Sequence, residues 1–520
     1  MDATGFDDCP RALPMKNQVQ LIVYADRFGG GRIRDLEALL TGPLKGLFGT
    51  VHVLPFFHRI DGADAGFDPI EHDRVDERLG DWTDIAGLGR QVDIMADVIV
   101  NHMSTDSPQF LDFLQRGNAS PHHGLFLTLD AVFPKGAREA DLAAIYRPRD
   151  GLPFTPVMLA TGEKRILWTT FTARQADIDV RHPEGWAYLE GILRTFSDHG
   201  IRAVRLDAVG YAIKQAGTSC FMVPATFEFI AELTELAHSL NIEVLVEVHS
   251  HYRQQIDIAT RVDWVYDFAL PPLLLHALFT RSTRYLKNWI AIRPHNALTV
   301  LDTHDGIGVI DAGPEAGDSG QPGLLPSHEI DRLVETIHDR SGGQSRLATG
   351  AAASNLDLYQ VNCTFYDALG RNDGDYLLAR AVQMFLPGIP QVYYVGFLAG
   401  RNDMELLGRT GVGRDINRHR YAPQELLAEL DRPVVRDLTA LIRLRNDHPA
   451  FHGKVCIGHT TDSMLALRWQ AGLDWAELIA DFSAGQWVVR HGGGDAAEML
   501  PLECLGTNDW RPDINFDWRS

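Results

Sequence analysis

Short runs of apolar, mostly β-branched residues recur along the chain, and most of them are followed by a polar or acidic residue. The runs cover residues 19–24, 51–56, 94–100, 203–206, 244–246, 264–266, 298–301 and 392–395. They are nearly continuous in apolar character rather than alternating, which is typical of parallel strands buried on both faces. The pattern therefore predicts eight buried parallel strands.

Amphipathic helical patterns lie between these runs. One places Leu189, Ile192, Leu193 and Phe196 on a single face and is followed by Gly200 as a stop signal. Another runs from residue 230 to 240 and is followed by an asparagine. Alternating strands and helices of this number predict an α/β fold of the (β/α)8 TIM barrel type, whose active site lies at the C-terminal ends of the strands.

Two stretches are too long to be simple crossovers, and both predict inserted subdomains. After a helix-like stretch at 434–446, runs at 464–469, 475–482 and 487–490 are separated by glycines and predict a C-terminal antiparallel β domain. We therefore expect an N-terminal extension at 1–14, barrel segments at 15–100, 181–305 and 371–450, an inserted domain B at 101–180, a loop-rich inserted subdomain B′ at 306–370, and the β domain at 451–520.

Charge and cysteine usage narrow the class of protein. The 520 residues include 69 acidic and 48 basic side chains, a formal net charge of -21, with no Lys/Arg-rich run. Such a surface repels nucleic acid and anionic membranes, so we expect neither as a partner.

The five cysteines are widely spaced without a CxxC pair, which argues against a disulfide framework or a zinc site. Residues 1–14 lack the apolar core of a signal peptide, so a cytoplasmic location is expected.

Three acidic residues follow predicted strands. Asp207 follows the fourth strand, Glu247 the fifth and Asp305 the seventh. Cleavage of a glycosidic bond needs one carboxylate facing the anomeric carbon and one protonated carboxyl facing the leaving oxygen. A single acid at a strand end is usually only the polar start of a loop, but an ordered set of three favours glycoside chemistry.

These residues lie in strings that resemble the α-amylase superfamily and, within it, the sucrose phosphorylase family. Superfamily motifs match Asp97 to His102, Ile201 to Asp207, Glu247 with its preceding strand, and Val300 to Asp305. The closer resemblance rests on residues 62–69, 145–149, 217–221, 355–360 and 413–419, and it covers roughly residues 15–450.

The resemblance implies a retaining mechanism in which Asp207 is the nucleophile, Glu247 the general acid/base and Asp305 the transition-state stabiliser. Arg205, two residues before Asp207, can hold that carboxylate ionised, whereas Glu247 needs a raised pKa to be protonated at rest. By the same resemblance, the glucosyl group is bound by Asp64, Phe67, His102, Arg205, His304 and Arg414.

The implied reaction transfers the glucosyl group of sucrose to inorganic phosphate and gives α-D-glucose 1-phosphate and D-fructose. The acceptor side implied by the resemblance consists of Tyr146, Pro148, Arg149, Tyr211, Phe221, His249, Asp357, Leu358, Tyr359 and Gln360. Arg149 is the one fixed cation in that set. No cofactor and no metal are expected, although Asn101 occupies a position that binds calcium in many amylase relatives. The same resemblance implies a homodimer.

Three alternatives remain at this point. Sister phosphorylases that act on sucrose 6′-phosphate, glucosylglycerol or glucosylglycerate would share the glucosyl pocket, and a sugar-phosphate acceptor would be expected to add a cation near residues 356–360. A hydrolase of the same superfamily would share the three acids. A non-catalytic barrel would have lost at least one of them, and all three are present.

Overall fold

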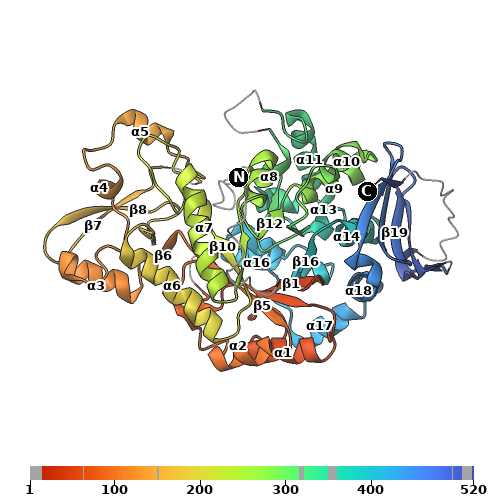
Figure 1. Ribbon diagram of the computed structural model, residues 1–520, viewed down its shortest axis with the longest axis horizontal. Helices are drawn as coiled ribbons and strands as arrows, with labels where there is room; N and C mark the ends of the chain where they lie inside the picture. The colour runs from red at the N-terminus through yellow and green to blue at the C-terminus, as the bar shows by residue number, and fades with distance from the viewer. Residues whose placement is uncertain are drawn as a thin grey trace, which may run out of the picture.

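The centre of the molecule is a closed barrel of eight parallel strands, seen in a computed structural model that describes residues 14–61, 64–148, 151–314, 321–349, 360–494, 496–505 and 518–519 (Figure 1). The order around the barrel is β1-β16-β13-β12-β11-β10-β5-β2, so strands that follow one another in sequence pair side by side. The strands are β1 (Gln20–Val23), β2 (Thr50–Val53), β5 (Asp93–Ile99), β10 (Ala203–Asp207), β11 (Glu243–Val246), β12 (Trp264–Asp267), β13 (Ala297–Thr299) and β16 (Ile389–Tyr393). The predicted (β/α)8 barrel is confirmed.

Several strands end earlier than the apolar runs that predicted them. The run at 51–56 continues past the end of β2, because Leu54 and Phe56 stay buried after the chain has left the barrel. The run predicted at 392–395 was placed too late: β16 begins at Ile389, and Tyr394–Phe397 forms the short helix α15. An apolar run shows which residues are buried, and the residues that follow the end of a strand can be buried as well.

The helices around the barrel begin and end where the chain offers capping signals. The helix α6 (Pro183–Asp198) starts with His182 as N-cap and a proline at its first position, and Gly200 follows it with a φ of 81°. The helix α7 (Pro224–Ser239) is followed by Asn241 with a φ of 60°. Both predicted helices are confirmed. The other helices that accompany the barrel are α1 (Ile33–Thr41), α2 (Trp82–Gly89), α8 (Tyr252–Ala259), α9 (Leu270–Thr280), α10 (Arg284–Ile290), α14 (Asp373–Phe385), α16 (Met404–Thr410), α17 (Pro423–Leu430) and α18 (Pro433–Asp447).

The segment between β5 and β10 projects from the barrel as a separate lobe at the left of Figure 1. It contains β6 (His102–Ser104), α3 (Pro108–Arg116), α4 (Leu129–Val132), α5 (Glu139–Ala144), β7 (Phe154–Met158), β8 (Lys164–Trp168) and β9 (Gln175–Asp177). Strands β6 and β9 pair antiparallel, with His102 opposite Asp177, so the segment leaves and re-enters the barrel through one small sheet.

The segment between β13 and β16 is more helical than its glycine and proline content predicted. Its described part holds β14 (Ile307–Gly308), α11 (Ser327–Arg340), α12 (Gln344–Leu347), β15 (Gln360–Val361) and α13 (Phe365–Ala368). The expectation of a loop-rich excursion is therefore wrong for residues 327–340. Strands β14 and β15 pair antiparallel with Gly308 opposite Gln360, which brings the two ends of the segment together. The predicted domain boundaries themselves stay predictions.

An antiparallel sheet follows α18 and packs at the opposite end of the molecule from the lobe (Figure 1). Its strands are β17 (Lys454–Gly458), β18 (Met464–Ala471), β19 (Asp474–Asp481), β20 (Gln486–Gly493), β21 (Glu498–Met499) and β22 (Trp518–Arg519), which confirms the predicted β domain. Trp469 in β18 donates its indole N–H to the carbonyl of Phe385 in α14 at 2.7 Å and so anchors the sheet on the barrel.

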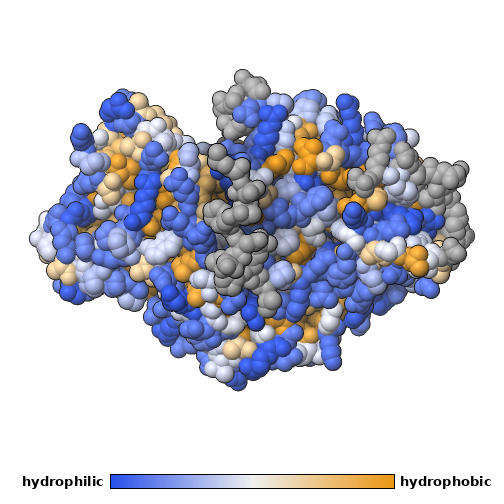
Figure 2. Space-filling model, in the orientation of Figure 1, coloured by the Kyte–Doolittle hydropathy of each residue, from blue (hydrophilic) through white to orange (hydrophobic). Residues whose placement is uncertain are grey.

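The face of the molecule shown in Figure 2 is largely hydrophilic. In the face shown in Figure 2, apolar side chains gather only in small groups between hydrophilic ones. Within the described ranges, every helix is too short or too polar to cross a bilayer.

Candidate active site

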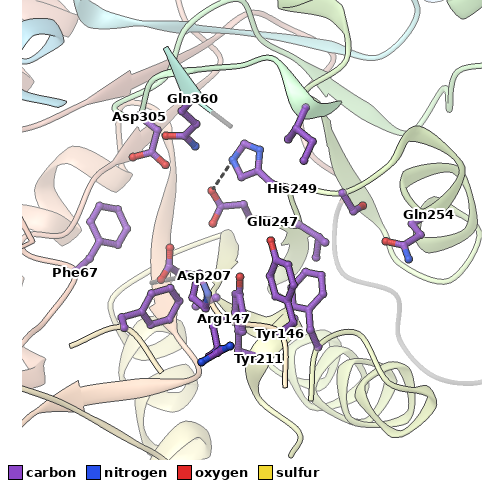
Figure 3. A pocket seen from close by; sticks show the side chains of 18 of the residues that line it. Phe67, Tyr146, Arg147, Asp207, Tyr211, Glu247, His249, Gln254, Asp305 and Gln360 are labelled. Carbon is purple, nitrogen blue, oxygen red and sulfur yellow. Dashed lines mark ion pairs between the residues drawn. The ribbon is translucent and has the colours of Figure 1, made fainter. Parts of the chain in front are cut away.

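A cavity of about 520 Å³ opens at the C-terminal ends of the barrel strands (Figure 3). Side chains from the barrel, from the lobe and from the β13–β16 segment line it together. Its walls include Asp64, Phe67, His102, Tyr146, Arg147, Pro148, Phe171, Asp207, Tyr211, Phe221, Glu247, His249, His251, Gln254, His304, Asp305, Ile310, Pro314, Gln360 and Arg414. The position is the one that barrel enzymes use for catalysis.

A single guanidinium joins the acidic residues on the floor of the cavity. Arg205 in β10 lies 3.1 Å from Asp207 and 2.5 Å from Glu247, and it also lies 2.5 Å from Asp97 of β5. The side chain of Arg205 is almost completely buried. Because Arg205 and Asp207 stand two residues apart on one strand, both side chains point to the same side of the barrel wall. Glu247 reaches the same cation from the end of the neighbouring strand β11.

The surroundings of this group raise the pKa of Asp207. Burial raises the pKa of the Asp207 carboxyl, and the nearby Glu247 and Asp97 raise it further against the opposing effect of Arg205. The direction is opposite to the expectation from the sequence that Arg205 holds Asp207 ionised. The physical reason is that Arg205 is shared among three carboxylates, and one cation cannot balance three buried anions. The sharing of Arg205 therefore holds two carboxyl groups side by side, as an acid and a nucleophile require.

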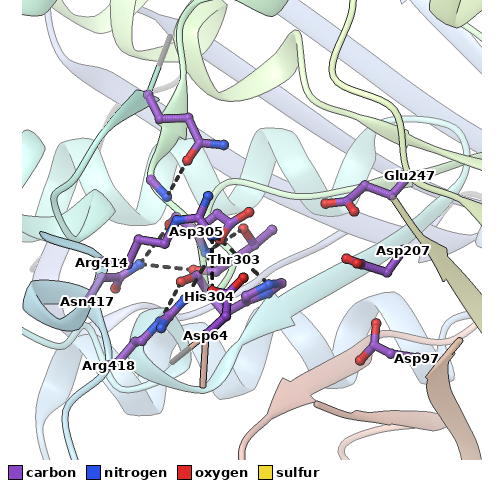
Figure 4. A network of polar contacts seen from close by, with 12 residues as sticks. Asp64, Asp97, Asp207, Glu247, Thr303, His304, Asp305, Arg414, Asn417 and Arg418 are labelled. Carbon is purple, nitrogen blue, oxygen red and sulfur yellow. Dashed lines mark hydrogen bonds and ion pairs between the residues drawn. The ribbon is translucent and has the colours of Figure 1, made fainter. Parts of the chain in front are cut away.

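Asp305 has the opposite environment, rich in cations (Figure 4). The cations are Arg414, 3.0 Å from its carboxylate, and Arg418, 3.9 Å away, and the ring of His304 lies 3.7 Å from the same carboxylate. Although burial raises its pKa, Arg414 and the other positive neighbours outweigh burial and hold the pKa of Asp305 well below its usual range. Arg418 and Asn417 also donate to the backbone carbonyls of His304 and Thr303, at 3.0 and 2.9 Å. Asp305 is thus a fixed, ionised carboxylate.

Two neutral histidines and a phenylalanine line the barrel side of the cavity. Burial lowers the pKa values of His102 and His304, so both imidazoles are uncharged near neutral pH. The ring of Phe67 stacks on His304 with centroids 4.7 Å apart, and the carbonyl of Phe67 accepts from His102 Nε2 at 3.1 Å. The buried Nδ1 of His102 has no hydrogen-bond partner among the described residues and can bind a sugar hydroxyl.

Aromatic rings from two distant parts of the chain form the wall opposite Asp305. Tyr146 comes from the lobe, whereas Tyr211 and Phe221 come from the loop after β10. The ring of Phe221 lies 4.9 Å from Tyr146 and 4.7 Å from Tyr211, and Phe171 contacts Tyr211 at 5.2 Å. Such a wall presents apolar faces and hydroxyls to a second sugar.

His249 stands between the glutamate and the β13–β16 segment (Figure 3). Its Nδ1 lies 3.0 Å from Asp311, and its Nε2 lies 3.9 Å from Glu247. Its ring stacks on Phe268 with centroids 4.0 Å apart. Burial lowers the pKa of His249, but Asp311, Glu247 and Asp305 raise it to about 9, so the ring is a cation at neutral pH.

The amine of Lys214 occupies the site around Asn101. It donates to Asn101 Oδ1 at 2.6 Å and to the carbonyl of Tyr211 at 2.5 Å, and it lies 2.5 Å from Asp177. These oxygens belong to the end of β5, to the loop after β10 and to β9 in the lobe. The ammonium group therefore ties the lobe to the barrel directly behind the aromatic wall.

The structure brings most of the predicted site residues to one cavity. The exception among the described residues is Arg205, which contacts the carboxylates but does not line the cavity. Arg149, Asp357, Leu358 and Tyr359 lie outside the described residues. The structure adds lining residues that were not predicted as site residues, among them Arg147, Phe171, Ser250, His251, Gln254, Ile310 and Pro314. Arg147 stands inside a string that the resemblance had singled out, whereas the others carried no local signal.

Comparisons with known proteins agree with this geometry. Residues 44–271 match the model of the alpha amylase catalytic domain. The chain is 58% identical to a sucrose phosphorylase of Agrobacterium vitis, over 92% of this chain and 98% of that protein. It is 54% identical to a sucrose phosphorylase of Bifidobacterium adolescentis, over 91% of this chain and 94% of that protein.

A solved structure matches over nearly the whole chain. The crystal structure of sucrose 6F-phosphate phosphorylase from Thermoanaerobacter thermosaccharolyticum superposes with a TM-score of 0.85 at 36% identity, and the match covers 94% of this chain and 98% of that chain. The similarity extends over barrel, lobe and C-terminal sheet together. The chain therefore belongs to the α-amylase superfamily and, within it, to the family that contains the sucrose phosphorylases of A. vitis and B. adolescentis.

Proposed function

We propose that the protein is a sucrose phosphorylase, a glucosyltransferase that moves the glucosyl group of sucrose to inorganic phosphate with retention of the α configuration. The observation that carries this proposal is 58% and 54% identity, over more than nine-tenths of the chain, to two proteins named sucrose phosphorylase. The cavity supports it, because a carboxylate group on one side faces an aromatic wall and a cationic histidine on the other.

In the first half-reaction, Asp207 attacks the anomeric carbon and Glu247 donates its proton to the bridging oxygen. The bond between that carbon and the oxygen breaks, fructose leaves as the neutral sugar, and a glucosyl ester forms on Asp207. The contacts of Arg205 support this assignment, since the guanidinium holds both carboxylates on one side of the cavity. Retention needs two carboxyl groups roughly 5 Å apart.

In the second half-reaction, an oxygen of dihydrogen phosphate attacks the anomeric carbon of the ester. The bond to Asp207 breaks with its electron pair returning to the carboxylate, and the proton of the attacking phosphate moves to Glu247. The products are glucose 1-phosphate and an enzyme with its proton restored. Charge and protons balance in each step.

Asp305 supplies negative charge where the sugar ring becomes positive. A carboxylate held ionised by Arg414 stabilises an oxocarbenium-like state, and its remaining oxygen can bind hydroxyls of the same sugar. The neutral His102 and His304 add hydrogen bonds without adding a positive charge that would oppose that state. Asp64 and Phe67 complete the proposed glucosyl site.

Incubation with sucrose, with and without inorganic phosphate, tests the proposal. We expect glucose 1-phosphate and fructose in equal amounts when phosphate is present. Free glucose at the same rate in both reactions would show a hydrolase instead.

A second candidate is a phosphorylase that accepts a phosphorylated sucrose. Arg147 favours it, because a guanidinium lines the acceptor side of the cavity, where a sugar phosphate needs a cation. The solved structure at 36% identity is that of a protein named for this activity. Initial rates with sucrose and with sucrose 6F-phosphate, each with phosphate present, separate the two. We expect sucrose to give the higher kcat/KM.

We also propose that the enzyme acts in the cytoplasm as a homodimer, in line with the resemblance. Light scattering from a size-exclusion column measures the mass directly, and twice the chain mass of 57.9 kDa is the expected result. A mass of one chain would contradict the dimer.

A further inference from the structure

The buried carboxylate of Asp311 has one titratable partner in the described part of the chain, and that partner is a ring of the cavity. Asp311 lies in the 3-10 turn η3 (Ile310–Ala312), it is fully buried, and its Oδ2 lies 3.0 Å from His249 Nδ1. Its Oδ1 accepts from the backbone of Ser250 at 3.2 Å and from Gln255 at 2.9 Å. With both oxygens bound in this way, the carboxylate cannot rotate, and neither can the ring it holds.

The other nitrogen of His249 points at the reaction. Nε2 is buried, lies 3.9 Å from Glu247 and has no hydrogen-bond partner among the described residues. A buried ring N–H without a partner is costly unless a ligand satisfies it. The acceptor of the second half-reaction must approach Glu247, so Nε2 faces the place where phosphate arrives.

Among the residues that the structure describes, the charged groups that face this ring are acidic. Asp311 comes from η3, Glu247 from the end of β11 and Asp305 from the loop after β13, while Phe268 stacks on the ring and is uncharged. Three carboxylates stabilise the protonated form of the ring, and a protonated ring attracts an anion.

The backbone of the β13–β16 segment is shaped for this contact. A methyl group at Gly308 in β14 would overlap Oδ2 of Asp311. Gly308 also pairs with Gln360 of β15, which lines the cavity, so the same two-stranded ladder places Asp311 and Gln360 around His249.

We propose that Asp311 is a positioning residue that holds His249 protonated and aimed at the acceptor, and that this pair makes the glucosyl-enzyme react with phosphate in preference to water. The inference rests on the proposed function. Water needs no cation to attack the ester, whereas phosphate gains a charge-assisted hydrogen bond from Nε2. Asp311 therefore acts on the choice of acceptor and not on the formation of the ester.

The test measures initial rates of glucose 1-phosphate and of free glucose from saturating sucrose across a range of phosphate concentrations. For Asp311→Asn we expect the half-saturating phosphate concentration to rise about 10-fold or more. The loss of a hydrogen bond between charged groups weakens binding by about this factor. Hydrolysis without phosphate should change less than about 3-fold, because the carboxylates that form the ester keep their contacts. An unchanged half-saturating concentration, or an equal fall in both rates, would overturn the proposal.

Asp263→Asn is the matched control. Asp263 also binds a histidine, His238, at 2.6 Å and a backbone N–H, that of Val244, at 3.1 Å, but it lies at the opposite end of the strands, just before β12. We expect its phosphate dependence to equal that of the wild type.

Two further variants keep the test decisive if Asp311→Asn does not fold. Gly308→Ala crowds Asp311 without removing its charge, and it should raise the half-saturating phosphate concentration in the same direction. In a His249→Ala background, adding Asp311→Asn should change that concentration no further, because Asp311 acts through the ring. Additive effects would contradict this.

The outcomes also separate a failure of the proposed function from a failure of the inference. Free glucose alone from the wild type would mean that the proposed function is wrong. Glucose 1-phosphate from the wild type, with an unaltered phosphate dependence in the variants, would refute only the role of Asp311.

Discussion

The two sides of the cavity are built in different ways. On the glucosyl side, Asp207 and Glu247 stand at the ends of adjacent strands and share one buried guanidinium, and Asp305 is held by Arg414. On the acceptor side, aromatic rings and His249 are brought together from the lobe, from the loop after β10 and from the β13–β16 segment. The barrel fixes the first side through strand register, whereas the second depends on how the excursions fold back. Changes to the first side should therefore stop the reaction, and changes to the second should redirect it.

The largest expected effect is at the nucleophile. Replacing Asp207 with Asn removes the group that forms the ester, so both glucose 1-phosphate and free glucose should decrease by a factor of at least ~10⁴. Rates with and without phosphate, measured on the folded variant, check this. If free glucose survived at the wild-type rate, the assignment of Asp207 would be wrong.

Arg205→Lys tests whether the shared guanidinium organises the glucosyl side. A lysine cannot bind three carboxylates in a fork, so we expect kcat to fall about 100-fold for both acceptors and stability to drop by about 3 kcal/mol. Steady-state rates and urea unfolding measure the two effects.

Arg194→Lys is the matched control for that change. Arg194 pairs with Glu190 at 2.5 Å on the exposed face of α6, where an ion pair contributes less than about 1 kcal/mol. An equal loss of stability in both variants would contradict the conclusion that the buried Arg205 contributes more to stability than the exposed Arg194.

Lys214→Met tests the attachment of the lobe. The change leaves Asp177 and Asn101 buried without their cation, which should lower the free energy of unfolding by about 3 kcal/mol. Urea unfolding measures it, with Lys16→Met as control because Lys16 pairs with Asp93 at the surface. We also expect the KM for sucrose to rise more than kcat falls, since Lys214 supports the carbonyl of Tyr211.

Phe221→Ala should affect the acceptor side alone. Removing the ring that joins Tyr146 and Tyr211 should raise the KM for sucrose about 10-fold and leave hydrolysis at saturating sucrose within about 3-fold of the wild type. Kinetics over a range of sucrose concentrations separate the change in KM from the change in kcat. An equal loss of kcat would show that the wall also orients the reacting carbon.

The smallest effect is a pH dependence of stability. Burial lowers the pKa of His249, but Asp311 and the other carboxylates outweigh it and raise the pKa to about 9 in the folded protein, above its value in the unfolded chain. The stabilisation is thus complete below about pH 6.5 and is lost as pH rises toward about 9. Because 28% of the side chain is exposed, we expect a change of only about 1 kcal/mol. Urea unfolding at pH 6 and pH 9 should show it in the wild type, and Asp311→Asn should reduce it.

The local sequence pattern was sufficient to predict the barrel and to place the carboxylates of Asp207 and Glu247 at strand ends. Buried parallel strands leave nearly continuous apolar runs, and an acid directly after such a run must lie at the catalytic end, so the order of residues in the chain locates Asp207 and Glu247. Strand ends were less certain, as β16 shows, because buried apolar residues continue into α15.

What the sequence determined by itself was the fold class, the glycosidic chemistry and the family, since these depend on periodicity and on motifs that stand together in the chain. Only the tertiary structure decided that Arg205 serves three carboxylates, that Lys214 joins the lobe to the barrel, and that Asp311 holds His249. Apart from the pair Arg205 and Asp207, these contacts join residues that are far apart in the chain, by 108 positions for Arg205 and Asp97. No local pattern records such a distance, because the energy of a buried charge depends on what surrounds it in space and not on its neighbours in sequence.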